Sequence, residues 1–435
     1  MNPRLFGTSG IRRLVSELPP EFVLKLAYSL GTYSDDKKIA IGRDTRSSSE
    51  RLENEFISGL LSTGHDVIDL GIVPTPVVAM ASEDYGTGVV VTASHNPPEW
   101  NGFKFWDNGI AYLPEQENAV EQIFYSGEFR DRGSRGCVEE KEYVEKYTER
   151  ILDNVGEVER PVRVLVDCAN GAGSVITPIL LEKMGCEVIA INTETNGVFA
   201  HGLEPTAENL RETCELVKKN NVDIGIAHDG DADRAAAIGS NGRLIDWDNF
   251  LAVLAYGKNK VVTTVDASMR IEDICKEVIR TPIGDVAVAS AISEENAEFG
   301  GEPSGSIIFP EVHLFPDGPL TAAKIVKMVS ENRFYETLEK IKTYPMKRVK
   351  VFYKKEQNPE NLMDRIKSEI LEEFKNEIKK INEIDGVRIT TDGGWFLTRP
   401  SGTEPCIRIT AEAKTEVLLT DLIERSSKCI HRVIN

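Results

Sequence analysis

Three carboxylates stand at alternate positions of one short segment, H-D-G-D-A-D-R, which directly follows a β-rich run. They are Asp229, Asp231 and Asp233. In an extended loop, carboxylates at this spacing can converge on one hard cation such as Mg²⁺, which prefers oxygen ligands. An EF-hand is excluded because Arg234 stands where that loop needs glycine, and Ser240 where it needs glutamate. A solvated acidic turn is the alternative, but three acids at a strand end beside an arginine favour a metal site.

A second segment, T-A-S-H-N-P-P at residues 92–98, follows the strand candidate 88–91. A serine at a strand end, held by a proline-stiffened loop, is well placed as a nucleophile or phosphate carrier, and this serine is Ser94. The adjacent His95 could stabilise charge or orient the loop. Lys104 is a candidate for proton transfer if its pKa is depressed. Viewed alone, the segment also fits an ordinary Ser/Asn/Pro loop.

A third segment, R-P-S-G-T-E-P at residues 399–405, could bind an anion. A turn rich in Ser, Gly and Thr can direct backbone N–H groups and hydroxyls at a phosphate, and Arg399 and Arg408 could add positive charge. The segment G-G-E-P-S-G-S at 300–306 offers a carboxylate and a hydroxyl that suit sugar hydroxyls. Residues 6–12 and 42–46 are polar loops at module edges. No Walker A motif occurs, and residues 170–176 supply only half of a dinucleotide fingerprint.

Short β-branched runs alternate with helical stretches, and these elements must position the loops. The expected strand, helix and strand are 38–42, 49–61 and 66–70, and the order recurs at 163–166, 177–184 and 187–191. Strands separated by helices need crossover connections, hence a largely parallel or mixed sheet covered by helices. The two copies suggest a duplicated α/β module, and a third unit is expected to begin near Lys260.

After Tyr344-Pro345 the pattern changes to that of a separate α+β module with a charged solvent face. We expect a strand at 348–353, an amphipathic helix at 359–384, antiparallel strands within 387–413 and a helix at 416–433. The resulting domains are 1–152, with the Ser94 loop; 153–252, with the three-Asp loop; 253–344, with the 300–306 loop; and 345–435, with the 399–405 loop.

The composition of the 435-residue chain is that of a soluble globular protein, with 41% hydrophobic and 28% charged residues. Its formal net charge of −19 disfavours nucleic acid and anionic membrane partners. No apolar run is long enough to span a bilayer, and the N-terminus lacks the features of a signal peptide. Seven scattered cysteines without a C-x-x-C pair are typical of reduced thiols. We therefore expect a cytoplasmic protein.

Five of these loops, in order along nearly the whole chain, resemble those of the α-D-phosphohexomutase family, which includes phosphoglucomutase, phosphomannomutase and phosphoglucosamine mutase. The motifs are F-G-T-S-G-I-R, T-A-S-H-N-P, D-G-D-A-D-R, G-G-E-P-S-G and R-P-S-G-T-E-P. Five motifs in the family's order are specific where any single one is not. The resemblance implies an α/β fold of three similar domains with mixed sheets and a smaller C-terminal α+β domain around a central cleft.

The resemblance also implies an activity, in which the 6-phosphate and 1-phosphate of a hexose or hexosamine interconvert through a phosphoserine and a 1,6-bisphosphate intermediate. One Mg²⁺ per active site and a hexose 1,6-bisphosphate activator would be the cofactors. A small-molecule sugar phosphate would be the partner of a monomer or homodimer. The resemblance assigns Ser94 as the phosphoserine, and it assigns Ser94, Asp229, Asp231 and Asp233 as the metal ligands. It gives Arg12 and Lys104 a role in catalysis. The residues that it assigns to substrate binding are Arg234, Glu302, Ser304, Arg399, Ser401, Gly402, Thr403 and Arg408.

Three positions depart from the common family pattern: Ser306 replaces a His, Cys406 a Lys and Arg13 a Gly. The form G-G-E-P-S-G-x-x-I-F-P and the modest length look most like archaeal members of the phosphoglucosamine mutase type. Glucose and mannose phosphates are the alternative substrates. A metal-dependent sugar phosphatase would use the same serine but release inorganic phosphate. A sugar-phosphate sensor would not need both Ser94 and the three-Asp loop.

Overall fold

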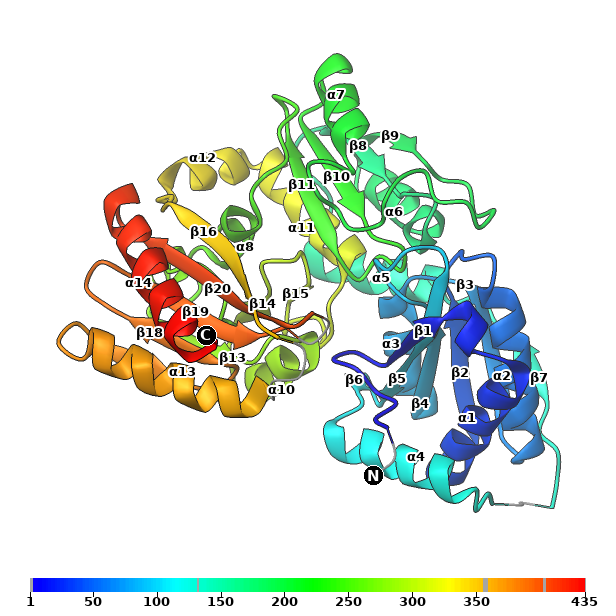
Figure 1. The fold of residues 1–435 in the computed structure, drawn as a ribbon. Helices are drawn as coiled ribbons and strands as arrows, with labels where there is room; N and C mark the ends of the chain where they lie inside the picture. The colour runs from blue at the N-terminus through cyan, green and yellow to red at the C-terminus, as the bar shows by residue number, and fades with distance from the viewer. Residues whose placement is uncertain (1–2, 131–132, 355–358, 402–403, 435) are drawn as a thin grey trace.

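The computed structural model describes residues 3–130, 133–354, 359–401 and 404–434. They form four lobes, each built on one β-sheet, which we number I to IV in chain order (Figure 1). Gly402 and Thr403 of the expected phosphate loop lie outside the described residues.

Lobe I contains the largest sheet, in the order β1-β5-β4-β2-β3-β7, with β6 paired to β5. Its strands are β1 (Ile11–Leu14), β2 (Lys38–Arg43), β3 (Asp66–Ile72), β4 (Thr87–Val91), β5 (Trp100–Asp107), β6 (Ile110–Ala111) and β7 (Val138–Glu140). Its helices are η1 (Val15–Glu17), α1 (Pro20–Tyr33), α2 (Ser49–Ser62), α3 (Thr75–Tyr85) and α4 (Pro114–Ser126), and α5 (Val144–Val155) follows β7.

Lobes II and III each contain a four-stranded sheet. Lobe II comprises β8 (Arg163–Asp167), η2 (Ala172–Val175), α6 (Thr177–Lys183), β9 (Glu187–Ile191), α7 (Arg211–Lys219), β10 (Ile224–His228) and β11 (Ala235–Gly239). Lobe III comprises α8 (Trp247–Ala255), β12 (Lys260–Thr264), α9 (Arg270–Ile274), β13 (Glu277–Thr281), α10 (Asp285–Glu295), β14 (Phe299–Gly301), β15 (Ile307–Ile308), α11 (Gly318–Ser330) and α12 (Arg333–Lys340).

Lobe IV, yellow-orange to red in Figure 1, has a five-stranded antiparallel sheet in the order β16-β20-β19-β18-β17. Its elements are β16 (Met346–Phe352), α13 (Pro359–Phe374), β17 (Lys380–Asn382), β18 (Val387–Thr390), β19 (Gly394–Pro400), β20 (Cys406–Ala413) and α14 (Glu416–Ile434).

The first three sheets repeat one topology. In each, the first strand of the repeat pairs in parallel with the second and third, and the third pairs antiparallel with the fourth. The repeats are β2 to β5, β8 to β11 and β12 to β15. The expected α/β class with mixed sheets is thus confirmed, and the module occurs three times. The domain boundaries near residues 153, 252 and 345 stay predictions.

This repetition places three chemistry-bearing loops at the same point of the topology. Ser94 lies between β4 and β5, Asp229 to Asp233 between β10 and β11, and Glu302 to Ser306 between β14 and β15. Each loop therefore connects the third and fourth strands of its repeat. A shared position at the ends of equivalent strands lets loops from three lobes meet.

The packing of β4 shows how the Ser94 loop is held. All five residues of β4 are buried, as expected for a strand covered on both faces. Because successive side chains point to opposite faces, Val90 enters a core that continues through lobes II and III, and Val89 and Val91 enter a core beneath α1 and α2. The first core joins the first three lobes. Lobe IV has its own core and meets lobe III through a small cluster around Trp395.

The single helix expected at 359–384 is wrong. Helix α13 ends at Phe374, whose buried ring lies 4.8 Å from that of Phe396. Residues 380–382 instead form the edge strand β17, with Ile381 opposite Ile389 of β18. The charge pattern of this segment is compatible with a helix, but the free edge of β18 offers backbone hydrogen bonds that the sequence pattern does not reveal.

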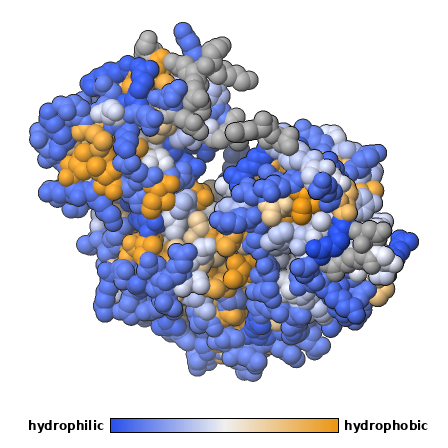
Figure 2. Space-filling view, turned by 90° about the horizontal axis from the view of Figure 1, so that it is seen from below, coloured by the Kyte–Doolittle hydropathy of each residue, from blue (hydrophilic) through white to orange (hydrophobic). Residues whose placement is uncertain are grey.

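Hydrophilic residues dominate the surface seen in Figure 2, with separate hydrophobic patches between them. No helix in the described part of the chain is both long and apolar enough to cross a membrane.

Candidate functional site

The Ser94 hydroxyl faces the acidic loop of lobe II. Ser94 is 1% exposed and has a positive φ of 50°, a conformation that is uncommon for residues other than glycine. Its Oγ donates a 2.8 Å hydrogen bond to Oδ2 of Asp229 and lies 3.3 Å from Nδ1 of His95. The two loops approach so closely that a Cβ atom at Gly230 would lie 2.7 Å from the carbonyl oxygen of Ser94. The serine is therefore pre-positioned against a carboxylate.

A buried arginine fixes the conformation of the serine loop. Nη2 of Arg46 donates 2.7 Å hydrogen bonds to the carbonyl oxygens of Ser94 and Asn96, and Nη1 donates to those of Pro97 and Trp100. Nε of Arg46 pairs with Asp44 at 2.9 Å. The sequence shows 42–46 only as a polar loop, since nothing in it indicates that four carbonyl groups converge on one guanidinium.

The three aspartates form a buried cluster. One carboxylate oxygen from each of Asp229, Asp231 and Asp233 lies within 4.8 Å of the others. Oδ2 of Asp231 accepts hydrogen bonds from Thr75 at 2.6 Å and from Lys104 at 2.7 Å. Burial alone would raise the pKa of Asp231, but Lys104 and Thr75 hold it below its ordinary value. Burial, followed by the charges of Asp233 and Asp231, raises the pKa of Asp229 well above its usual range.

The cluster fits a divalent cation. Among the described residues, Oδ1 of Asp231 and Oδ1 of Asp233 are buried and have no hydrogen-bond partner. Buried carboxylate oxygens without partners are costly in free energy. A hard cation held by oxygen ligands would satisfy both, which is the donor chemistry that Mg²⁺ prefers.

Lys104 is the counter-ion of this cluster. Its Nζ lies 2.7 Å from Asp231 and 2.6 Å from Asp233. Burial alone would lower the pKa of Lys104, but the two carboxylates raise it above the ordinary value for lysine. The depressed pKa on which a proton-transfer role was conditional is therefore not found. Lys104 is placed here as a positive charge against Asp231 and Asp233.

A cavity of 180 Å³ adjoins the cluster, and we call it the active-site cavity. Its lining residues come from all three similar lobes and are Thr8, Ser9, Arg12, His95, Asp233, Arg234, Asp266, Ile283, Gly284, Asp285, Glu302, Pro303, Ser304 and Ser306. The structure thus brings Arg12, Arg234, Glu302 and Ser304 of the sequence-predicted set together. Ser306, which departs from the family pattern, lies in the same wall.

The active-site cavity has polar atoms ready for a ligand. Within the described chain, Nε of Arg12, Nε of Arg234 and Oγ of Ser304 are buried and lack hydrogen-bond partners. Glu302 accepts a hydrogen bond from the Gly284 N–H at 3.0 Å. Burial and then the charge of Asp285 raise the pKa of Glu302 to about 7. Cationic and acidic groups in one cavity suit a ligand with both phosphate and hydroxyl groups.

His95 and Asp285 are two further titratable residues that line the active-site cavity. Burial, and then the charges of Arg234 and Arg12, lower the pKa of His95 to about 3. Its imidazole is therefore neutral and can orient the Ser94 loop but adds no charge.

Burial also raises the pKa of Asp285. Asp285 was missed from the sequence, although its position directly after Pro282-Ile283-Gly284, a turn signal, could have marked it.

The expected phosphate loop of lobe IV lies apart from the active-site cavity. Arg399 pairs with Asp385 at 3.4 Å, and Arg408, its direct cross-strand neighbour, is 3.9 Å from Glu404. Neither arginine lines the active-site cavity, and Ser401 does not line it either. A link exists, because Asp385 also accepts a 3.3 Å hydrogen bond from the N–H of Ile283 in the cavity wall. Gly402 and Thr403 are outside the described residues.

A buried serine on a carboxylate cluster, next to a polar cavity that three α/β lobes enclose, defines an enzyme site suited to metal-assisted phosphoryl transfer. The sequence matches the four consecutive domains described as phosphoglucomutase/phosphomannomutase: alpha/beta/alpha domain I over residues 3–131, domain II over 141–242, domain III over 248–348 and the C-terminal domain over 348–427. The chain belongs to this family, and the expected resemblance is confirmed.

Individual relatives agree with this assignment. A probable phosphoglucosamine mutase of Methanopyrus kandleri is 42% identical, covering 99% of this chain and 98% of the relative. A phosphoglucomutase/phosphomannomutase family protein of Burkholderia thailandensis has the same fold, with a TM-score of 0.87, 24% identity and coverage of 100% of this chain and 99% of that one. The N-acetylphosphoglucosamine mutase of Aspergillus fumigatus, solved with GlcNAc-6P and magnesium, has a TM-score of 0.60 at 16% identity, covering 99% and 96%.

Proposed function

We propose that this protein is a phosphoglucosamine mutase, which interconverts glucosamine 6-phosphate and glucosamine 1-phosphate. The observation that carries the proposal is the 2.8 Å hydrogen bond from Ser94 to Asp229 at the edge of the active-site cavity. Relatives with this name, at 39% to 42% identity over the whole chain, favour glucosamine over glucose and mannose. Phosphoglucomutase or phosphomannomutase activity is the second candidate.

Ser94 would carry the phosphoryl group between turnovers. A hydroxyl oxygen of the bound sugar phosphate attacks the phosphorus and forms a new O–P bond, while the bond from phosphorus to Ser94 Oγ breaks. The proton of the attacking hydroxyl is transferred, in net terms, to the departing Oγ, which restores the Ser94 hydroxyl. The product is a 1,6-bisphosphate. After it turns in the cavity, Ser94 takes back the other phosphoryl group, so that the positions of phosphate on the sugar are exchanged. A hexose 1,6-bisphosphate would prime an unphosphorylated enzyme, which is why we propose it as the activator.

Asp229, Asp231 and Asp233 would hold one Mg²⁺ together with an oxygen on Ser94. When bound, the cation supplies charge neutralisation for the transferred group. Arg12, Arg234 and Lys104 add positive charge on the same side. Phosphoryl transfer depends mainly on positioning and charge neutralisation. The Ser94 loop, which Arg46 holds in place, provides the positioning.

Glu302 and Ser304 would bind sugar hydroxyls, and Arg399, Ser401, Gly402, Thr403 and Arg408 would bind the phosphate that does not react. A second phosphate site distinct from the aspartate cluster favours a mutase over a phosphatase, because such a site would retain the bisphosphate intermediate while the intermediate turns.

The substrate assignment is tested by measuring kcat/KM for the 1-phosphates of glucosamine, glucose and mannose, each with its matching 1,6-bisphosphate. Glucosamine 1-phosphate should give the highest value, although cross-reactivity is expected since Glu302 and Ser304 would meet hydroxyls that glucosamine and glucose share. An advantage of more than about tenfold for another sugar, equivalent to ~1.4 kcal/mol, would contradict the substrate but not the mutase. Accumulation of inorganic phosphate would indicate a phosphatase.

A further inference from the structure

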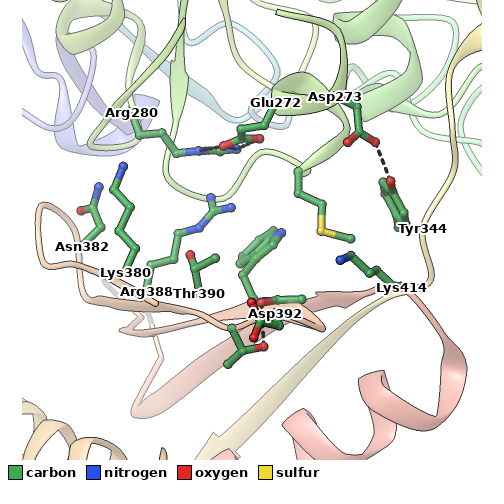
Figure 3. Close-up of a pocket in the computed structure, with 14 residues that line it drawn as sticks. Glu272, Asp273, Arg280, Tyr344, Lys380, Asn382, Arg388, Thr390, Asp392 and Lys414 are labelled. Carbon is green, nitrogen blue, oxygen red and sulfur yellow. Dashed lines mark hydrogen bonds and ion pairs between the residues drawn. The ribbon is translucent and has the colours of Figure 1, made fainter. Parts of the chain in front are cut away.

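A second cavity, of 330 Å³, lies between lobe III and lobe IV, and we call it the interlobe cavity (Figure 3). Its walls come from α9 and β13 of lobe III and from β17, β18 and β19 of lobe IV. None of its described lining residues also lines the active-site cavity. The interlobe cavity is therefore a separate space, of a size that accommodates small-molecule ligands.

The main feature of the interlobe cavity is a buried arginine without a carboxylate partner. Arg388 on β18 is 4% exposed. Its Nη1 donates to the carbonyl oxygens of Val265 and Ala267, and its guanidinium carbon lies 3.8 Å from the centre of the Trp395 ring. Among the described residues, no carboxylate pairs with Arg388, and its Nε and Nη2 donate to no protein acceptor. A buried cation of this kind is costly unless an anion compensates it.

The acidic residues of the interlobe cavity form no ion pair with Arg388, because other groups engage them, although the charge of Glu272 still favours the charged form of Arg388. Glu272 pairs with Arg280 at 2.6 Å, Asp273 accepts a hydrogen bond from Tyr344 at 2.5 Å, and Asp392 pairs with Lys379 at 3.0 Å. Two further cations, Lys380 and Lys414, line the same space. Four cationic and three acidic side chains therefore line the interlobe cavity, a formal excess of one positive charge, on a chain whose formal net charge is −19.

Strand geometry places Lys380, Arg388 and Thr390 on the same face of the lobe IV sheet. Arg388 and Thr390 stand two residues apart on β18, and side chains at that spacing share a face of the sheet. Lys380 of β17 is the direct cross-strand partner of Thr390. Figure 3 shows Lys380, Arg388 and Thr390 extending from the lobe IV strands toward Arg280 and Glu272 of lobe III. A guanidinium, an ammonium and a hydroxyl are thereby placed around one space.

We propose that the interlobe cavity is a binding site for a phosphorylated small molecule, whose phosphate is held by Arg388, Lys380 and Thr390. The free Nε and Nη2 donors of Arg388 form a planar fork that matches two phosphate oxygens. The Lys380 ammonium and the Thr390 hydroxyl serve the remaining oxygens. The site would be regulatory, since it lies outside the active-site cavity.

The fold connects this site to the active-site cavity. Arg280 is on β13, and the chain that follows this strand continues within five residues to Ile283 and Asp285 in the wall of the active-site cavity. Ile283 also donates its N–H to Asp385, the partner of Arg399. A ligand held between Arg388 and the Arg280 wall would restrict movement of lobe IV against lobe III. Such a ligand should lower kcat without competing with the sugar phosphate.

Calorimetric titration of the full-length protein with inorganic pyrophosphate in metal-free buffer tests the site without requiring turnover, so its outcome is separable from that of the proposed function. We expect two binding events. The double variant Lys380→Glu/Lys414→Glu changes exposed side chains and should weaken one event by at least about tenfold, while Arg399→Gln should weaken the other. Lys347→Glu, an exposed charge reversal on β16, is the matched control and should change neither.

Arg388→Gln should abolish the same event as the double variant, with unfolding by urea used to check that the protein remains folded. ADP and citrate distinguish the possible sources of the anion. Tighter binding of ADP than of pyrophosphate would assign a nucleotide, and equal or tighter binding of citrate would overturn the choice of phosphate. The site itself is refuted if the double variant binds pyrophosphate like the wild type, or if Arg399→Gln removes all binding.

Discussion

The hydroxyl of Ser94 donates a 2.8 Å hydrogen bond to Asp229, a residue 135 positions further along the chain. The two residues come from loops at equivalent positions of two repeated modules, each connecting the third and fourth strands. A core shared by the first three lobes holds the two modules together. The contact between the Ser94 loop and the three-Asp loop therefore follows from the repetition of one topology.

Loss of one cluster carboxylate should reduce both metal affinity and rate. In Asp229→Asn, a neutral amide replaces a carboxylate that the proposed site would use to hold a hard cation. We expect kcat to fall by at least about 10²-fold, given that even partners of metal ligands commonly cost 10–100-fold, and the Mg²⁺ concentration for half-maximal activity to rise. EDTA should inactivate the wild type, and added Mg²⁺ should restore it.

Asp246→Asn is the control for this experiment, because Asp246 is an exposed N-terminal cap of α8 that neither belongs to the aspartate cluster nor lines the active-site cavity. It should retain wild-type metal dependence. Full activity of the wild type in excess chelator would show that the three aspartates do not hold a metal ion that the reaction needs.

Arg46→Lys should disturb catalysis by loosening the Ser94 loop. A lysine cannot reproduce the four hydrogen bonds that the Arg46 guanidinium donates to loop carbonyls. We expect kcat to fall with little change in KM, and the free energy of unfolding to fall by about 2 kcal/mol or more as buried carbonyls lose their donors. Arg51→Lys, an exposed change on α2, should affect neither quantity. An unaltered kcat in Arg46→Lys would remove Arg46 from the account.

Arg399→Gln should weaken binding of the phosphate that does not react. Because a charge-assisted contact to phosphate is lost, we expect KM to rise by about tenfold or more, with a smaller effect on kcat. Arg348→Gln, an exposed change on β16 of the same lobe, provides the control. Equal KM values for Arg399→Gln and the wild type would place the phosphate elsewhere.

The stability of lobe II should depend on pH through one ion pair. His201 lies 3.0 Å from buried Asp167. Burial alone would lower the pKa of His201, but Asp167 raises it above the ordinary value. The stabilisation is therefore fully present below the ordinary pKa of histidine and is lost as pH rises through the raised pKa.

The corresponding measurement is the free energy of unfolding in urea at pH 6 and pH 9. The wild type should lose more stability between these values than His201→Gln, in which the ionisable partner is removed. An equal loss in both proteins would mean that the His201–Asp167 pair does not contribute.

The sequence predicted the parts of the site that depend on residue type in a loop. Ser94 and the three aspartates stand at strand ends in segments whose composition already suggests their chemistry. The sequence could not predict that Arg46 holds the Ser94 loop, because this role depends on where four carbonyl groups meet in space. The raised pKa of Lys104 likewise depends on two carboxylates more than 120 residues away. The predicted helix 359–384 was wrong for the same reason, since pairing with β18 determines β17.

Transfer of label from a bisphosphate tests the central claim most directly. The protein is incubated with glucosamine 1,6-bisphosphate carrying ³²P and with unlabelled glucosamine 6-phosphate, and the label is followed by peptide mapping and sugar analysis. The account predicts that label enters only the peptide containing Ser94, then passes into sugar phosphate, and is absent from Ser94→Ala protein. Interconversion of the two sugar phosphates with no label on Ser94, or release of the label chiefly as inorganic phosphate, would contradict it.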